Sequence, residues 1–213
     1  MNDSQKFKRW DWIDYQFTSS KDDPRTESQK VVPETVTVGE SVKKSERSRL
    51  LSPLIRHSFQ EAEKRGESLT LIRPKEIEIV YSEKTDEEIS SERAKHAELA
   101  AQMSLFDATA KPLEPCPIQF TASWRDYDGK KRRHECDDWE TSTAFSRFER
   151  EYGRKKAIEI IRSKYEEEYF ASGLALAFST HSRRNVHFGK TNQWLLVGVI
   201  RIDASGQGDL LWR

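Results

Sequence analysis

The sequence lacks several features that would place it in a familiar class. Its only cysteines are Cys116 and Cys136, so no disulfide framework is expected. No apolar run reaches 18 residues, which argues against a membrane-spanning helix. Basic and acidic side chains number 36 each, so no overall positive field attracts nucleic acid. Residues 1–12 alternate charges with aromatics and lack the apolar centre of a signal peptide. We therefore expect a cytoplasmic protein, and no motif in it predicts a cofactor.

Composition predicts that the 213 residues are not folded from end to end. Hydrophobic residues make up 35% and charged residues 34%, which is a low apolar share for a fully packed chain. Residues 18–48 have almost no large apolar groups, so we expect a flexible linker there. Three regions follow: a largely disordered segment with an aromatic patch (1–48), a small helix–strand–helix region (49–112) and an α+β domain (113–213).

Local signals place the elements of the middle region. Ser52 followed by Pro53 predicts the start of a helix, and Gly66 predicts its end. Residues 69–81 alternate apolar and polar side chains as strands do, with a break at Pro74. Residues 85–103 show helical spacing again, and Thr85 with Glu88 has the spacing of a capping box.

The last hundred residues predict a ββααββ order, with two helices packed on a mainly antiparallel sheet. Asp128 and Gly129 predict a two-residue hairpin turn between strands at 118–124 and 131–139. Asp137 and Glu140 have capping-box spacing for the first helix, and Gly153 and Gly173 end the two helices. Strands follow at 174–178 and 194–202. The second is almost continuously apolar, so we expect it in the centre of the sheet.

Residues 102–107 read Gln-Met-Ser-Leu-Phe-Asp, between the predicted helix and a proline-rich stretch. This string resembles the short peptide with which bacterial DNA-handling proteins bind the replicative sliding clamp, Gln-x-(Ser/Asp)-Leu-Phe. The resemblance implies that two apolar side chains enter a groove on the clamp while the first residue bonds its rim. The residues concerned are Gln102, Met103, Ser104, Leu105 and Phe106.

Two other readings bear on this peptide. Leu105 and Phe106 also fit the last apolar positions of an amphipathic helix that packs on its own domain. A weaker match to the same pattern lies at residues 207–212, Gln-Gly-Asp-Leu-Leu-Trp, where Gly208 and Leu211 depart from it.

Two local basic clusters make nucleic acid a candidate ligand, although the net charge of the chain is zero. One cluster lies at the predicted hairpin and the other in a polar loop before the last strand. Trp124, Tyr127 and Phe188 are near enough in sequence to stack on single-stranded bases. The basic residues are Lys130, Lys131, Arg132, Arg133, Arg183, Arg184, His187 and Lys190.

Metal and acid–base chemistry receive less support from the sequence. His134 and Cys136 share a strand face and could ligate zinc with Cys116, His181 or His187, but no Cys-x-x-Cys or His-x-x-x-His spacing is present. Carboxylates near the hairpin could form a divalent-metal nuclease centre. Helix capping and turn formation explain most of them equally well. They are Asp126, Asp128, Glu135, Asp137, Asp138 and Glu140.

The sequence therefore favours a non-enzymatic accessory factor of DNA replication, repair or mobile-element metabolism, recruited by a sliding clamp. One alternative is a small metal-dependent nuclease. Another is a structural subunit or adaptor of a larger complex, anchored by Trp10 and Trp12. The expected partners are the clamp, DNA or another nucleic acid, and further protein subunits, but no membrane.

Overall fold

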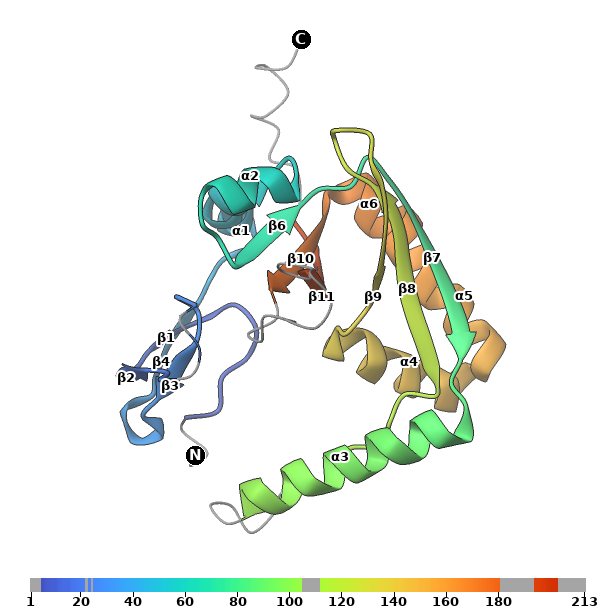
Figure 1. The fold of residues 1–213 in the computed structure, drawn as a ribbon, viewed down its shortest axis with the longest axis horizontal. Coiled ribbons are helices and arrows are strands. Elements are labelled where there is room, and N and C mark those ends of the chain that lie inside the picture. The colour runs from blue at the N-terminus through green and yellow to red at the C-terminus, as the bar shows by residue number, and fades with distance from the viewer. Residues whose placement is uncertain (1–4, 22, 24, 105–111, 181–193, 203–213) are drawn as a thin grey trace.

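The computed structural model describes residues 5–21, 23, 25–104, 112–180 and 194–202 (Figure 1). Its N-terminal part contains two small antiparallel pairs of strands. β1 (Asp11–Asp14) pairs with β4 (Thr37–Ser41), and β2 (Phe17–Ser19) pairs with β3 (Gln29–Val31). A 3₁₀ turn, η2 (Pro33–Thr35), precedes β4, and helix α1 (Lys44–Leu51) follows it.

These elements differ from the flexible linker expected over residues 18–48. Val36 and Val42 are buried in this segment, and polar contacts add to their packing. The Gln16 amide donates to Thr35 Oγ1 at 2.8 Å, and Gln5 Nε2 donates to the Pro33 carbonyl at 2.8 Å. A polar contact also reaches the rest of the chain, where Ser68 Oγ donates to Glu27 Oε2 at 2.7 Å. Composition alone predicts disorder here because it registers apolar content and not such bonds.

The helix expected from Pro53 to Gly66 begins later in the structure. A 3₁₀ turn, η3 (Ser52–Leu54), leads into the short strand β5 (Ile55–Arg56), and helix α2 spans only Phe59–Lys64. β5 runs parallel to β6 (Leu69–Ile72), and the buried Arg56 Nε donates to Glu67 at 2.8 Å. Pairing with β6 therefore overrides the helix-start signal. Gly66 ends α2 as predicted, at φ 69°.

Two sheets follow, and the break at Pro74 separates them as predicted. The first has the order β11-β10-β6-β5, with β10 (Leu174–Thr180) and β11 (Trp194–Arg201) antiparallel. The second has the order β7-β8-β9 and is antiparallel throughout; its strands are β7 (Glu76–Glu83), β8 (Ile118–Arg125) and β9 (Lys131–Glu135). The expected central position of residues 194–202 is wrong: β10 lies inside the sheet and β11 is at its edge. A single parallel bridge between Cys136 and Leu196 links β11 to the chain after β9.

The predicted helices form with mostly the predicted ends. α4 (Trp139–Tyr152) ends at Gly153, where φ is 81°, and α5 (Arg154–Ser163) continues through a π-helical turn, η4 (Lys164–Tyr169), and α6 (Phe170–Ser172) to Gly173. The N-cap of α4 is Asp138, whose side chain accepts from the Glu140 amide, and not the predicted Asp137. α3 (Asp86–Ser104) carries the predicted capping box, since the Thr85 amide donates to Glu88 at 2.7 Å.

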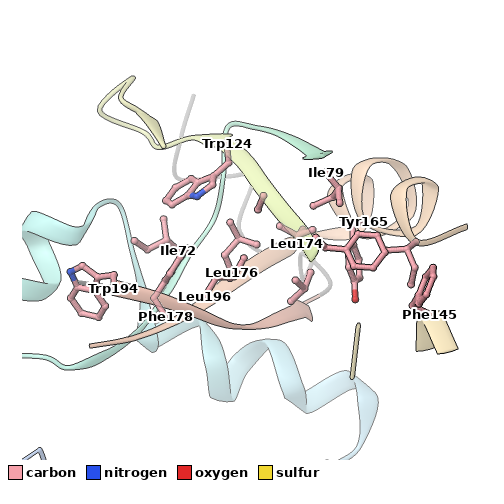
Figure 2. Packing of buried hydrophobic residues seen from close by; sticks show 14 of the residues in the cluster. Ile72, Ile79, Trp124, Phe145, Tyr165, Leu174, Leu176, Phe178, Trp194 and Leu196 are labelled. Carbon is pink, nitrogen blue, oxygen red and sulfur yellow. The ribbon is translucent and has the colours of Figure 1, made fainter. Parts of the chain in front are cut away.

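One hydrophobic core joins both sheets, α2 and the helices α4 and α5 (Figure 2). Trp124 of β8 and Phe178 of β10 lie with ring centroids 5.4 Å apart, and Phe59 of α2 packs edge-on against both. The fold is therefore α+β with the predicted ββααββ order, and the regions 49–112 and 113–213 share this core. Within the part of the chain that the structure describes, no helix is long and apolar enough to cross a membrane.

Candidate nucleic-acid interface

The β8–β9 hairpin presents one of the predicted basic clusters. Three residues, Tyr127, Asp128 and Gly129, connect Asp126 to Lys130, whose backbone groups bond each other, so the turn is one residue longer than predicted. Gly129 has φ 80°, a left-handed conformation that glycine adopts without strain. Asp126 is completely buried and its side chain accepts from the Lys130 amide at 2.8 Å. A buried carboxylate thus holds the turn in one shape.

Alternation along β9 separates its cations into two groups. Arg132 faces the core side, where its Nε donates to Asp126 Oδ2 at 2.8 Å and its guanidinium lies 4.7 Å from the Phe59 ring centroid. Lys131 and Arg133 face the opposite side and are exposed, as is Lys130 in the turn. Arg132 neutralises Asp126, and the three exposed residues remain as candidate phosphate contacts.

The register of the hairpin adds residues that the sequence analysis did not single out. Arg125 lies opposite Lys131, and it bonds Glu76 at 3.2 Å and the Gly129 carbonyl at 2.7 Å. Tyr127 is 48% exposed at the tip, and the Lys75 ammonium lies 5.6 Å from its ring centroid. Cross-strand pairing could have indicated Arg125, which sits as far from the turn as Lys131 does. The Lys75 contact depends on the tertiary fold and has no local signal.

Of the three aromatic residues proposed to stack on bases, Tyr127 is exposed at the tip of the hairpin and can contact a base. Trp124 is 3% exposed, and its Nε1–H donates to His134 Nδ1 at 3.0 Å. It belongs to the core, in phase with Phe120 and Ala122 on the same face of β8. Phe188 lies outside the described residues, as do Arg183, Arg184, His187 and Lys190 of the second basic cluster.

An open groove of about 440 Å³ is lined by residues of β8, β9 and β11, among them Arg133 and Trp194. Polar side chains also line it, including Gln119, Thr121 and Glu135. Asp137 is another lining residue, and partial desolvation and the nearby Glu135 carboxylate raise its pKa. The groove offers both donors and acceptors next to the basic hairpin.

The carboxylates considered for a nuclease centre are partly engaged in holding the fold. Asp126 fixes the hairpin turn, and Asp138 accepts from Thr141 Oγ1 at 2.9 Å besides capping α4. Among the described residues, no group of three or more His, Cys, Asp or Glu side chains is arranged to hold a metal ion. His134 and Cys136 have other neighbours: Trp124 donates to the histidine, and Cys136 Sγ lies 3.8 Å from Thr141 Oγ1.

The clamp-like peptide lies at the boundary of the described structure. α3 ends at Ser104, while residues 105–107 and the side chains of residues 102–104 are outside the described part. The weaker match at residues 207–212 is also outside it. At the N-terminus, Trp12 is 57% exposed on β1, whereas Trp10 is half-buried beneath the Arg47 guanidinium, 4.4 Å from its ring centroid.

Fold and surface together define an α+β protein whose second sheet carries an exposed, basic and aromatic hairpin. The chain belongs to the family described as Domain of unknown function (DUF8757), which matches residues 53–209. Residues 1–57 match a second family, described as Domain of unknown function (DUF8758). No curated protein and no solved structure matches the chain.

Proposed function

We propose that this protein is a non-enzymatic accessory factor of DNA metabolism that contacts nucleic acid through the β8–β9 hairpin. The observation that carries the proposal is the grouping of Lys130, Lys131 and Arg133, all exposed, beside the exposed Tyr127. Cations bind phosphates of any sequence, and an aromatic ring stacks on any base. The combination favours nucleic acid over a purely acidic protein surface.

The rigidity of the hairpin supports this proposal. Asp126 and Arg132 form an ion pair at 2.8 Å below the turn, with Asp126 fully buried. The backbone that carries the exposed cations is therefore fixed and loses little conformational freedom when a ligand binds. Acidic residues share this surface: Glu76 pairs with Arg125, Asp128 lies in the turn, and Glu78 and Glu135 are exposed on the same face of the sheet. The exposed cations Lys130 and Lys131 gather at the turn end of the hairpin.

Recruitment by a bacterial sliding clamp through Gln102, Leu105 and Phe106 remains part of the proposal. Its support is the sequence pattern at the end of α3 together with the position of that helix. α3 extends along the lower edge of the molecule in Figure 1, so its end is accessible to a partner. In this proposal the protein acts in the cytoplasm, where clamp and DNA are found together.

A second candidate function, a subunit or adaptor of a larger complex, is favoured by exposed aromatics near the N-terminus. Phe7 and Phe17 are each 49% exposed and Trp12 is 57% exposed. Exposed aromatic side chains of this kind often anchor protein interfaces. Loss of a defined complex in a Trp12→Ala variant, with nucleic-acid binding retained, would favour this role over the first.

The proposal is tested by fluorescence anisotropy with labelled single-stranded and duplex DNA at several salt concentrations. A variant with Lys130, Lys131 and Arg133 all replaced by alanine should bind at least about tenfold more weakly, and its log–log salt slope should fall by about 2 to 3, because each lost phosphate contact contributes 0.7 to 0.9. Tyr127→Ala should weaken single-strand binding by about 1–3 kcal/mol and leave the salt slope unchanged.

The matched control removes the same charge from another exposed surface, with Arg150, Lys155 and Lys156 replaced by alanine on α4 and α5. This variant should bind DNA like the wild type. If the hairpin variant and the control have equal affinities and equal salt slopes, the hairpin is not the nucleic-acid contact and the proposal is wrong.

A further inference from the structure

A second basic site lies where the N-terminal region meets the C-terminal helices and β11. It is a pocket of about 170 Å³, built from the segment before β1, helix α1, the π-helical turn η4 and the end of β11. Its lining residues are Arg9, Trp10, Lys44, Arg47, Tyr169 and Arg201.

Four cations gather around this pocket. Arg9 forms an ion pair with Glu140 of α4, and Arg201 Nη1 lies 3.2 Å from Glu168. Lys44 and Arg47 bring two further cations to the same small space. Among the described residues, the buried Nε of Arg47 has no hydrogen-bond partner. A buried donor without an acceptor is unfavourable, so a shift of the Arg47 guanidinium toward a bound acceptor would be favourable.

Trp10 brings two of these cations together. The Arg47 guanidinium lies 4.4 Å from the Trp10 ring centroid and that of Arg9 lies 5.8 Å from it. Among the described residues other than glycine, Trp10 is the one with a positive φ, which is 78°. An L-residue rarely adopts this conformation, and such strain concentrates at ligand-binding sites. The backbone of Trp10 therefore has an unfavourable left-handed conformation where the guanidinium groups of Arg9 and Arg47 approach the same ring.

We propose that this pocket binds a phosphate-class oxyanion, either free inorganic phosphate or the phosphate group of a nucleotide. A volume of about 170 Å³ is too small for a drug-sized ligand and sufficient for such an ion. Guanidinium groups match phosphate oxygens in a bidentate fork, and the ammonium of Lys44 adds a point charge. The anion would accept from the guanidinium of Arg47 and reduce the repulsion between the cations. The site is separate from the hairpin and does not depend on the function proposed for it.

The test uses the full chain in a buffer free of phosphate and sulfate. Inorganic phosphate and adenosine monophosphate are titrated by calorimetry at constant ionic strength, with chloride as the reference ion. Saturable binding is expected, together with a higher melting temperature in phosphate than in chloride. An affinity for the nucleotide at least about tenfold above that for phosphate assigns a nucleotide as the source, and equal affinities assign the free ion.

Arg47→Ala should weaken binding at least about tenfold, whereas Arg47→Lys, which keeps the charge without the fork, should be intermediate. The control is Arg49→Ala, on the same helix and with a side chain 80% exposed, which should bind like the wild type. Lys44→Gln provides a second loss-of-binding variant if Arg47→Ala does not fold. Phosphate binding that is undetectable, or unchanged in both Arg47→Ala and Lys44→Gln, would overturn the proposal. Either result leaves the hairpin proposal standing, because its variants are different.

Discussion

His134 shows how the core fixes the protonation state of a single residue. Its ring lies 4.9 Å from Phe178 and 5.6 Å from Phe59, measured between centroids. Trp124 Nε1–H can only donate, so His134 Nδ1 must accept and carry no proton. Burial and, secondarily, the positive charge of Arg132 lower the pKa of His134 from 6.5 to about 4. The folded protein therefore contains a neutral imidazole at neutral pH and well below it.

This shift predicts that acid destabilises the protein through His134. Between pH 6.5 and pH 4 the histidine is protonated in the unfolded state and neutral in the folded state. The free energy of unfolding therefore decreases as the pH falls toward 4. The loss from this group should be on the order of 2 kcal/mol at pH 5 relative to pH 7. Urea unfolding of the wild type and of His134→Gln at both pH values measures the difference.

His134→Gln should lose most of this pH dependence because its side-chain oxygen can still accept from Trp124 and does not titrate. Equal changes in unfolding free energy between pH 7 and 5 in wild type and His134→Gln would contradict the prediction.

Asp138 links two elements, α4 and β11. Besides capping α4, its carboxylate accepts from Thr141 Oγ1 at 2.9 Å and from the Val199 amide at 3.4 Å. Thr141 in turn shares a 2.7 Å hydrogen bond with the Tyr165 hydroxyl at the start of the π-helical turn. One buried side chain thus aligns the start of a helix, the edge strand and the second helix.

Replacing Asp138 with alanine is expected to destabilise the fold by about 2–3 kcal/mol, because it removes the N-cap and leaves buried donors without an acceptor. Chemical denaturation with far-UV circular dichroism measures this. Glu87→Ala, an exposed acidic substitution in the first turn of α3, should cost less than about 0.5 kcal/mol. A destabilisation of Asp138→Ala no larger than that of Glu87→Ala would show that the network does not stabilise the fold.

The elements that the sequence predicted well are those with strong local signals. Gly153 and Gly173 end their helices in positive-φ conformations, and the alternation of β8 matches its buried face. The alternation of apolar residues in β8 places Trp124 on the same face as Phe120 and Ala122, which is the buried face. The aromatic side chain of Trp124 alone suggested stacking on bases. The strands β2, β3, β4 and β5 were missed because they form by pairing with other segments, and no local pattern encodes such pairing.

The candidate site was predictable to a similar extent. The basic character of residues 130–133 is visible in the sequence, but the inward position of Arg132 follows from the buried Asp126, which no local pattern reveals as buried. The basic pocket could not have been predicted at all. Its residues come from segments near positions 9, 47, 169 and 201, which only the folded chain brings together.

The whole molecule places its two proposed contacts at opposite ends. In Figure 1 the β8–β9 turn stands at the top of the view and α3 extends along the bottom. A clamp bound beyond the end of α3 would therefore leave the hairpin accessible to DNA. The two interactions should be independent, so that substitutions in one leave the other unchanged.

Replacing both Leu105 and Phe106 with alanine is expected to abolish a micromolar complex with purified sliding clamp, because these side chains would fill its groove. Surface plasmon resonance with immobilised clamp measures the complex, and anisotropy should show unchanged DNA binding. The control is Leu99→Ala, an exposed leucine of α3 outside the motif. Clamp binding that survives the double substitution would remove recruitment by this peptide from the proposed function.

The basic pocket has a consequence for how the two family regions depend on each other. Arg9, Trp10, Lys44 and Arg47 belong to the first region, residues 1–57, and Tyr169 and Arg201 to the second, residues 53–209. Neither region alone contains the site. A bound oxyanion would bridge the two regions and stabilise the contact between them. The free energy that holds the N-terminal region against the second region would then increase with the phosphate concentration around the protein.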